Sequence, residues 1–201
     1  MGMAQFEIGE ILSIPERCLA KKSSEGVRIF AQVERSNGTG GVLSLQLRGY
    51  QLKNARETFM RTIKSNPYFE MMRKVDMPSG GWFVVYRSNV RMNHLNPLWQ
   101  EGKIDLESLC NGDLDRIIRI EVRDFIGSWR GNKNSSMGYF ETTVRHLIES
   151  KAEFGNGDQT KAYTLMQGLE EEEEGQIVVL EAQTFAEEST PVEHEAVFLM
   201  T

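Results

Sequence analysis

Short runs in which apolar and polar residues alternate dominate this 201-residue sequence, and they limit the folds open to it. In residues 41–49, "GVLSLQLRG", Leu43, Leu45 and Leu47 fall on one face of an extended chain. Residues 116–124, "RIIRIEVRD", repeat the pattern with isoleucine and valine. A period of two is typical of strands with one buried face. The sequence therefore predicts an antiparallel all-β fold, either a sandwich or a barrel.

The rest of the chain also consists of strand-like runs separated by turns. Further strand-like runs occupy residues 26–35, 67–75, 81–88, 103–109, 138–144 and 176–185, with turn-rich stretches such as "MPSGG" and "CNGDLD" between them. Helical periodicity is clear only in 144–154, where we expect one short helix. The run "LEEEEEG" (169–175) is interpreted as a solvated loop or linker because adjacent like charges repel.

The net charge of −6 conceals an asymmetry between the two parts of the chain. Residues 169–201 hold ten acids and no Lys or Arg, which leaves 19 acids against 23 bases in residues 1–168. A basic body is compatible with an anionic partner. The Lys and Arg residues are scattered and show no aromatic-interleaved signature, so we expect no nucleic-acid partner.

Motifs of catalysis and cofactor binding are missing from the sequence. It contains no GxSxG elbow, HExxH or P-loop, and its three histidines have no ligand at metal-binding spacing on one element. Cys18 and Cys110 lie far apart and are expected to be small buried side chains in a reducing compartment. No apolar run approaches the about 20 residues that span a bilayer. These features predict a cytoplasmic binding protein with no cofactor rather than an enzyme.

Three stretches of the sequence together carry a resemblance to a known family. The most specific is 86–125, which holds Asn-Pro-Leu-Trp and then Leu-Cys-Asn-Gly-Asp; the others are "LSLQLRGYQLKN" with "SNPYFEMMRKV", and "MGYFETTVRHL". They resemble the second C2 domain of copines over residues 41–183. The resemblance implies an eight-stranded antiparallel β-sandwich with little helix. It also implies loops at one end that bind calcium and then phospholipid.

Domain boundaries follow from the same resemblance. "FEIGEILSIP" and "GVRIFAQVERSN" resemble the closing strands of a first copine C2 domain. We therefore expect strands of a preceding C2 domain in 1–35, a C2 domain in 36–185, and a disordered acidic tail in 186–201. The von Willebrand factor A-type domain of full-length copines has no counterpart, so the chain is expected to be a fragment or a reduced relative of a longer copine.

The residues that match the family's calcium ligands are largely replaced. Asp124 matches the first acid of the third loop, the position of the second acid is Ile126, and Asn66 stands where a Ser-Asp-Pro acid is expected. Glu57 is the only acid in residues 53–64. The resemblance implies a degenerate site of Asp124, Asn66 and Glu57 that binds calcium weakly or not at all. Two alternatives stay open: calcium-dependent phospholipid binding as in intact copines, and a purely turn-stabilising role for Asp124.

Basic and apolar residues surround these positions instead. We predict that they form a lipid-docking surface composed of Lys53, Arg56, Phe59, Met60, Arg61, Lys64, Trp129, Arg130 and Lys133. Its partner would be an anionic phospholipid surface, with the protein peripheral at the cytoplasmic side of the plasma membrane. The alternatives are that these bases are ordinary solvated charges with the aromatics packed on the sandwich, or that the chain binds a protein partner and no lipid.

Overall fold

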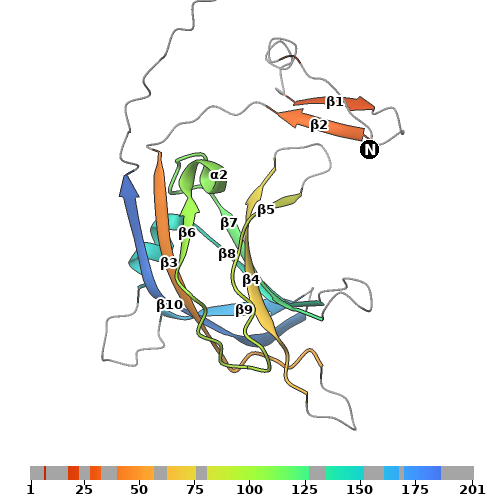
Figure 1. Cartoon of the computed structure of the whole chain (residues 1–201), viewed down its shortest axis with the longest axis vertical. Helices are drawn as coiled ribbons and strands as arrows, with labels where there is room; N and C mark the ends of the chain where they lie inside the picture. The colour runs from red at the N-terminus through yellow and green to blue at the C-terminus, as the bar shows by residue number, and fades with distance from the viewer. Residues whose placement is uncertain are drawn as a thin grey trace, which may run out of the picture.

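The computed structural model describes residues 7, 18–22, 28–32, 40–56, 63–75, 81–126, 135–151, 161–167 and 170–186. Most of these residues belong to strands (Figure 1). The two helices that it describes are short, α2 (Leu106–Cys110) and α3 (Val144–Glu149). No helix in these ranges is both long and apolar enough to cross a bilayer.

Eight of the described strands form one continuous antiparallel sheet in the order β5-β4-β7-β8-β9-β10-β3-β6. Their bounds are β3 (Gly41–Tyr50), β4 (Pro67–Lys74), β5 (Trp82–Arg87), β6 (Gly102–Asp105), β7 (Ile118–Asp124), β8 (Ser135–Thr142), β9 (Tyr163–Gln167) and β10 (Glu170–Ala186). The sheet folds over between β8 and β9, where Tyr139 pairs with Met166.

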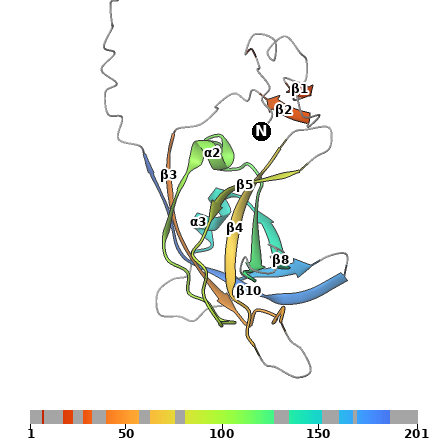
Figure 2. The same ribbon diagram turned by 45° about the vertical axis from the view of Figure 1, so that its right-hand side comes forward.

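The fold-over places two four-stranded layers face to face. Figures 1 and 2 show β3 and β10 on one side of the molecule and β4, β5 and β7 on the other. Strands β5 and β6 are the two ends of the strand order and do not pair with each other, so the sheet is a sandwich and not a closed barrel. The predicted eight-stranded antiparallel β-sandwich with little helix is confirmed.

The core lies between the two layers and follows the predicted alternation. Leu43, Leu45 and Leu47 of β3 are fully buried, as are the alternate residues Ile118, Ile120 and Val122 of β7. Trp99 is also fully buried, meets the Phe69 ring edge-on at 5.2 Å between centroids, and donates its indole N–H to the Pro67 carbonyl at 3.2 Å. Burying so many large apolar side chains supplies most of the driving force for folding.

The predicted strand at 103–109 is wrong in its second half. Strand β6 ends at Asp105, and helix α2 follows directly. The Asp105 carboxylate accepts the backbone N–H groups of Glu107 and Ser108, which caps the helix. Leu106, Leu109 and Cys110 then face the core at helical spacing. Cys110 is buried as predicted, and burial raises the pKa of its thiol to about 11.

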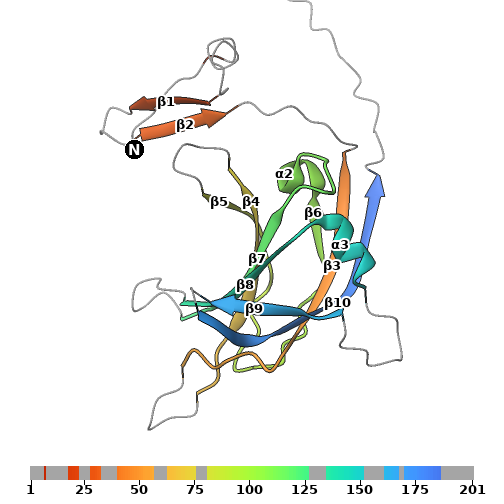
Figure 3. The same cartoon turned by 180° about the vertical axis from the view of Figure 1, so that it is seen from behind.

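The predicted loop over residues 169–175 is also wrong, because strand β10 begins at Glu170. Glu170 pairs with Gln167 of β9 and Glu173 pairs with Met166, with one register shift between these pairs and a second one before Gln176. Backbone pairing uses the N–H and C=O groups that every non-proline residue carries, so a run of acids does not exclude a strand. The helix expected at 144–154 appears as α3, which ends earlier, at Glu149, and lies beside β10 in Figure 3.

The N-terminal strands form a separate two-stranded sheet. Strand β1 (Cys18–Lys22) pairs antiparallel with β2 (Arg28–Gln32), and neither joins the eight-stranded sheet. The side chain of Cys18 and the acidic tail at 187–201 lie outside what the structure describes.

Candidate functional site

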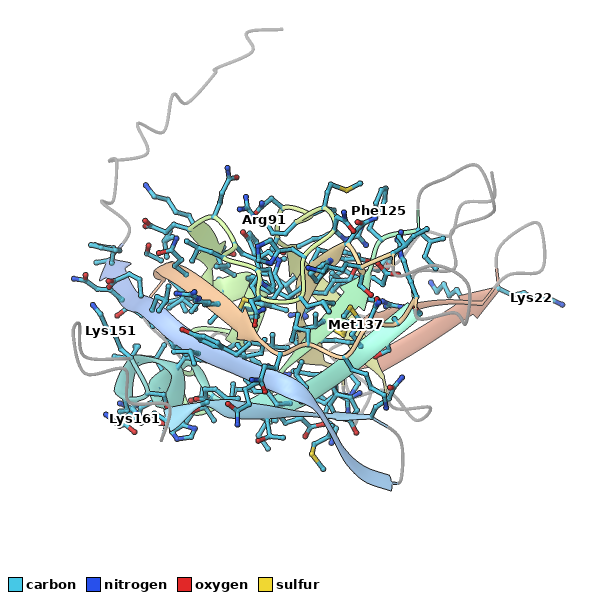
Figure 4. The ribbon with its side chains drawn as sticks, turned by 90° about the horizontal axis from the view of Figure 1, so that it is seen from below. Lys22, Arg91, Phe125, Met137, Lys151 and Lys161 are labelled. Carbon is cyan, nitrogen blue, oxygen red and sulfur yellow. The ribbon has the colours of Figure 1, made fainter. Side chains whose placement is uncertain are left out.

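Three connections meet at one end of the sandwich, which we call the loop end. They are loop 1 between β3 and β4 (described over 51–56 and 63–66), loop 2 between β5 and β6 (88–101), and the start of loop 3 after β7 (125–126). Backbone hydrogen bonds join them: the N–H of His94 donates to Ser65 at 3.0 Å, and the N–H of Phe125 donates to Asn66 at 3.0 Å. Arg91 and Phe125 lie on the same side of the molecule in Figure 4.

Asp124 is the buried acid of the loop end. It is the last residue of β7, and its side chain has no solvent exposure. One carboxylate oxygen, Oδ1, accepts the backbone N–H of Asn66 at 2.7 Å. The other, Oδ2, accepts the Nε–H of Arg56 at 2.5 Å. Both oxygens of this carboxylate are therefore engaged by the chain itself.

Arg56 bridges loop 1 and loop 3 through its guanidinium. Besides its ion pair with Asp124, it donates a second hydrogen bond from an Nη atom to the Phe125 carbonyl. Its side chain is 23% exposed, so the charge is partly withdrawn from water. The sequence analysis predicted Arg56 as a lipid contact; in the structure its guanidinium contacts the Asp124 carboxylate.

Asn66 uses its amide to join all three loops. Its Nδ2 donates to the Phe125 carbonyl at 3.1 Å, and its Oδ1 accepts the backbone N–H of Asn93 at 2.8 Å. The side chain is buried at 7% exposure. Position 66 therefore requires a side chain that both donates and accepts a hydrogen bond. An amide does both, whereas an ionised carboxylate can only accept.

A second polar cluster closes loop 1 on itself. The Ser65 hydroxyl donates to Asn54 Oδ1 at 3.0 Å and accepts the N–H of Ala55 at the same distance. Asn54 Nδ2 in turn donates to the Ile63 carbonyl at 3.0 Å. The sequence analysis missed Asn54, Ser65 and Asn93, because short polar residues in turns are too common to single out.

The described residues of the loop end do not by themselves supply the ligands of a calcium ion. Calcium takes six to eight oxygen ligands, largely from carboxylates. Among the described residues, no three His, Cys, Asp or Glu side chains gather as metal ligands. At the loop end Asp124 is already bound by Arg56. Ile126, at the position where the copine resemblance expects a second acid, is an apolar side chain with 40% exposure. Glu57, the remaining predicted ligand, lies outside the described residues.

The outer surface of the loop end combines bases with apolar side chains. Lys53 and Lys64 are both exposed. Large apolar side chains from all three loops are exposed beside them, namely Ile63 (46%), Met92 (65%), Phe125 (36%) and Ile126 (40%). The sequence analysis did not select these four, although each is an apolar residue in a turn-rich stretch. The other predicted lipid contacts, Phe59, Met60, Arg61, Trp129, Arg130 and Lys133, lie outside the described residues.

A pocket of about 240 Å³ opens between loop 1 and the start of β8. The residues that line it are Lys53, Asn54, Ala55, Ser135, Ser136, Met137 and Gln167. Gln167 is fixed there by a hydrogen bond from its Nε2 to the Ser136 carbonyl at 3.2 Å. Five of its seven lining residues have polar side chains, and one of the five is a lysine.

Lys103 and Arg119, two strand-face bases outside the loop end, do not form a common patch. Lys103 lies on β6, whereas Arg119 lies on β7 in the other layer. Arg119 is paired with Glu141 at 2.6 Å, and its guanidinium stacks over the Trp82 ring at 4.4 Å and the Tyr139 ring at 4.0 Å. Its charge is thus neutralised and its flat faces are covered.

Comparison with solved structures identifies the class of fold. BON1-C2B matches this chain with a TM-score of 0.58 and 19% sequence identity, over 74% of this chain and 94% of that chain. A C2 domain of plant Extended Synaptotagmin 1 matches with a TM-score of 0.45 and 14% identity, over 77% of this chain and 100% of that chain. No protein-family model matches the sequence. The chain has the fold of a C2 domain, and any statement about its function has to rest on the loop end itself.

Proposed function

We propose that this chain is a copine-type C2 domain that docks peripherally on anionic phospholipid membranes without calcium. The observation that carries the proposal is the neutralisation of Asp124 by Arg56, beside a surface of exposed lysines and apolar side chains. Acidic loops need a bound cation before they can approach an anionic surface. This loop end already has its acid neutralised and adds positive charge of its own.

The exposed side chains supply two kinds of attraction. Each Lys near an anionic leaflet contributes about 1 kcal/mol, and Lys53 and Lys64 both face solvent at the loop end. Apolar side chains such as Met92 and Ile63 gain free energy by leaving water for the acyl boundary. The polar pocket beside Lys53 would receive a phosphate headgroup, since an ammonium and hydroxyl groups are suitable donors to phosphate oxygens.

The proposal extends to the organisation and location of the protein. The sandwich begins with β3 at Gly41 and ends with β10 at Ala186, which supports a C2 domain over residues 36–185. We propose that residues 1–35 belong to a preceding C2 domain and that 186–201 form a separate acidic tail. The proposed location is the cytoplasmic face of the plasma membrane, where anionic lipids are enriched.

Vesicle co-sedimentation tests the proposal. The chain should pellet with vesicles of phosphatidylserine and phosphatidylcholine, equally with and without a calcium chelator, and not with phosphatidylcholine alone. Lys53→Ala with Lys64→Ala should lower the affinity about 30-fold, because two charges near the surface are lost. The matched control is Lys103→Ala with Lys161→Ala, which removes two exposed lysines from β6 and from the start of the β9 segment.

Three outcomes would contradict the proposal, and the first two of them would favour an alternative. Absence of binding to phosphatidylserine vesicles under both conditions would favour a protein-interaction module without lipid binding. Binding that the chelator abolishes would indicate calcium-dependent phospholipid binding as in intact copines. Equal loss in the control variant would show that only overall charge matters, and the loop end would then have no special role.

A further inference from the structure

We propose that Arg56 is the resident cation of the loop end: its guanidinium takes the place of a metal ion and holds loop 1 against the end of β7. This role of Arg56 is structural, so it does not depend on whether the loop end binds lipid. It starts from the burial of Asp124, whose side chain has no solvent exposure. A buried carboxylate is costly unless a cation and hydrogen bonds compensate it.

Arg56 supplies that compensation in full. Its Nε lies 2.5 Å from Asp124 Oδ2, and among the ion pairs of the described residues it is the cation that reaches this carboxylate. The same guanidinium donates to the neighbouring Phe125 carbonyl. A carboxylate and a backbone carbonyl are the two kinds of oxygen that a bound calcium ion collects from loops. A planar group with several fixed donors can satisfy both at once.

The arrangement also explains how distant segments stay together. Arg56 and Asp124 are 68 positions apart in the sequence, and Arg56 comes from loop 1 while Asp124 ends β7. Asn66 reinforces the contact, since its backbone N–H occupies the other carboxylate oxygen at 2.7 Å. An arginine is charged at every physiological pH, so this link does not depend on the concentration of any ion. Arg56 is therefore a positioning residue, and the exposed lysines are the bases that face an external partner.

A double-mutant cycle on the full chain tests the inference. Arg56→Met keeps an unbranched apolar side chain but removes the charge, and it should lower the Tm by about 10 °C because Asp124 stays buried without a cation. Adding Asp124→Asn should restore at least half of that loss, since a neutral amide still accepts the Asn66 N–H and needs no cation. A loss that is merely additive in the double variant would overturn the inference.

Arg145→Met is the matched control for the removal of an Arg–Asp pair. Arg145 Nε lies 2.6 Å from Asp115 Oδ1, but the two side chains are 54% and 62% exposed. We expect a Tm change of no more than about 3 °C, as for other exposed pairs. A fall for Arg56→Met no larger than in this control would contradict the proposal. If Arg56→Met yields no folded protein, the double variant decides: a folded double variant supports the inference and an unfolded one refutes it.

Calcium itself gives an independent readout. Adding about 1 mM calcium should leave the Tm of the wild-type chain unchanged, because a ligand raises the Tm only where the folded state binds it. A clear rise would overturn the inference, since it would show that a divalent ion can take the position assigned to the guanidinium. This readout uses no lipid, so its failure is distinguishable from a failure of vesicle binding.

Discussion

At the scale of single residues, Asn66 shows why an amide stands where the resemblance expects an acid. The side chain donates from Nδ2 to the Phe125 carbonyl and accepts the Asn93 N–H on Oδ1. Its backbone N–H already binds the Asp124 carboxylate. A second carboxylate at this position would lose the donor and bring two negative charges together, which the buried environment makes unfavourable.

Asn66→Asp is therefore expected to destabilise the fold by about 2 kcal/mol, as for a buried acceptor left without its donor. Urea denaturation at pH 7 measures the difference in the free energy of unfolding. Asn89→Asp is the control, because the Asn89 side chain is seen accepting the Gln100 N–H through Oδ1, which a carboxylate can also do. An Asn66→Asp variant as stable as this control would mean that the amide donor contributes nothing.

At the scale of elements, the clearest case is helix α2, which replaces the second half of a predicted strand. Asp105 is the last residue of β6, and its side chain caps α2. Asn111 follows the last residue of the helix and has a left-handed backbone conformation with φ 57°. The pKa of the Asp105 carboxyl is lowered, first by the side-chain hydrogen bond from Ser108 and also by backbone N–H groups. The folded state thus favours the ionised form of the Asp105 carboxyl.

Asp105→Ala should cost about 1 kcal/mol of stability at neutral pH through loss of the cap. Because the folded-state pKa lies below the ordinary value of 3.8, this contribution is present above that value and is lost as the pH falls through the folded pKa. Urea denaturation at pH 7 and at about pH 3 should show the gap between wild type and variant narrowing in acid. Asp105→Asn keeps an acceptor and serves as the control; a gap that is equal at both pH values would contradict the assignment.

At the scale of the whole molecule, the two layers are joined by the β8–β9 pairing on one side and by side chains on the other. The open side is closed by Tyr86 of β5, which packs over Gly102 of β6. A Cβ at Gly102 would overlap the Tyr86 hydroxyl and would lie 2.5 Å from its Cζ. Burial also raises the pKa of Tyr86. The missing side chain is what lets the edge strands approach.

Gly102→Ala should therefore destabilise the sandwich by about 1–3 kcal/mol, the usual cost of overpacking. In an unhindered strand the same change would stabilise by about 0.5–1 kcal/mol through backbone entropy, so the sign of the effect is the test. The free energy of unfolding is compared for Gly102→Ala in the wild-type chain and in a Tyr86→Val background, where the penalty should disappear. A stabilising effect in the wild-type chain would show that the layers do not meet here.

Most of the strands and their buried faces could be predicted from the residue pattern alone. The leucines of β3 and the isoleucines of β7 could be assigned to the core because a period of two is a local property of an extended chain. The resemblance also pointed to Asp124 and Asn66 together, and the structure places them in direct contact. The sequence pattern did not predict helix α2 or the strand through Glu170–Glu174. Helix capping and backbone pairing override the local composition in these two segments.

The partner of Asp124, in contrast, is visible only in the folded chain. Arg56 and Asp124 come within 2.5 Å across a sequence separation of 68 residues, and no local pattern encodes that meeting. The sequence marked Arg56 as one more base in a basic loop, whereas the folded chain uses it as the partner of a buried acid. The physical reason is that loops from different strands become neighbours only after the strands pair and the two layers stack, so contacts between loops depend on the whole topology.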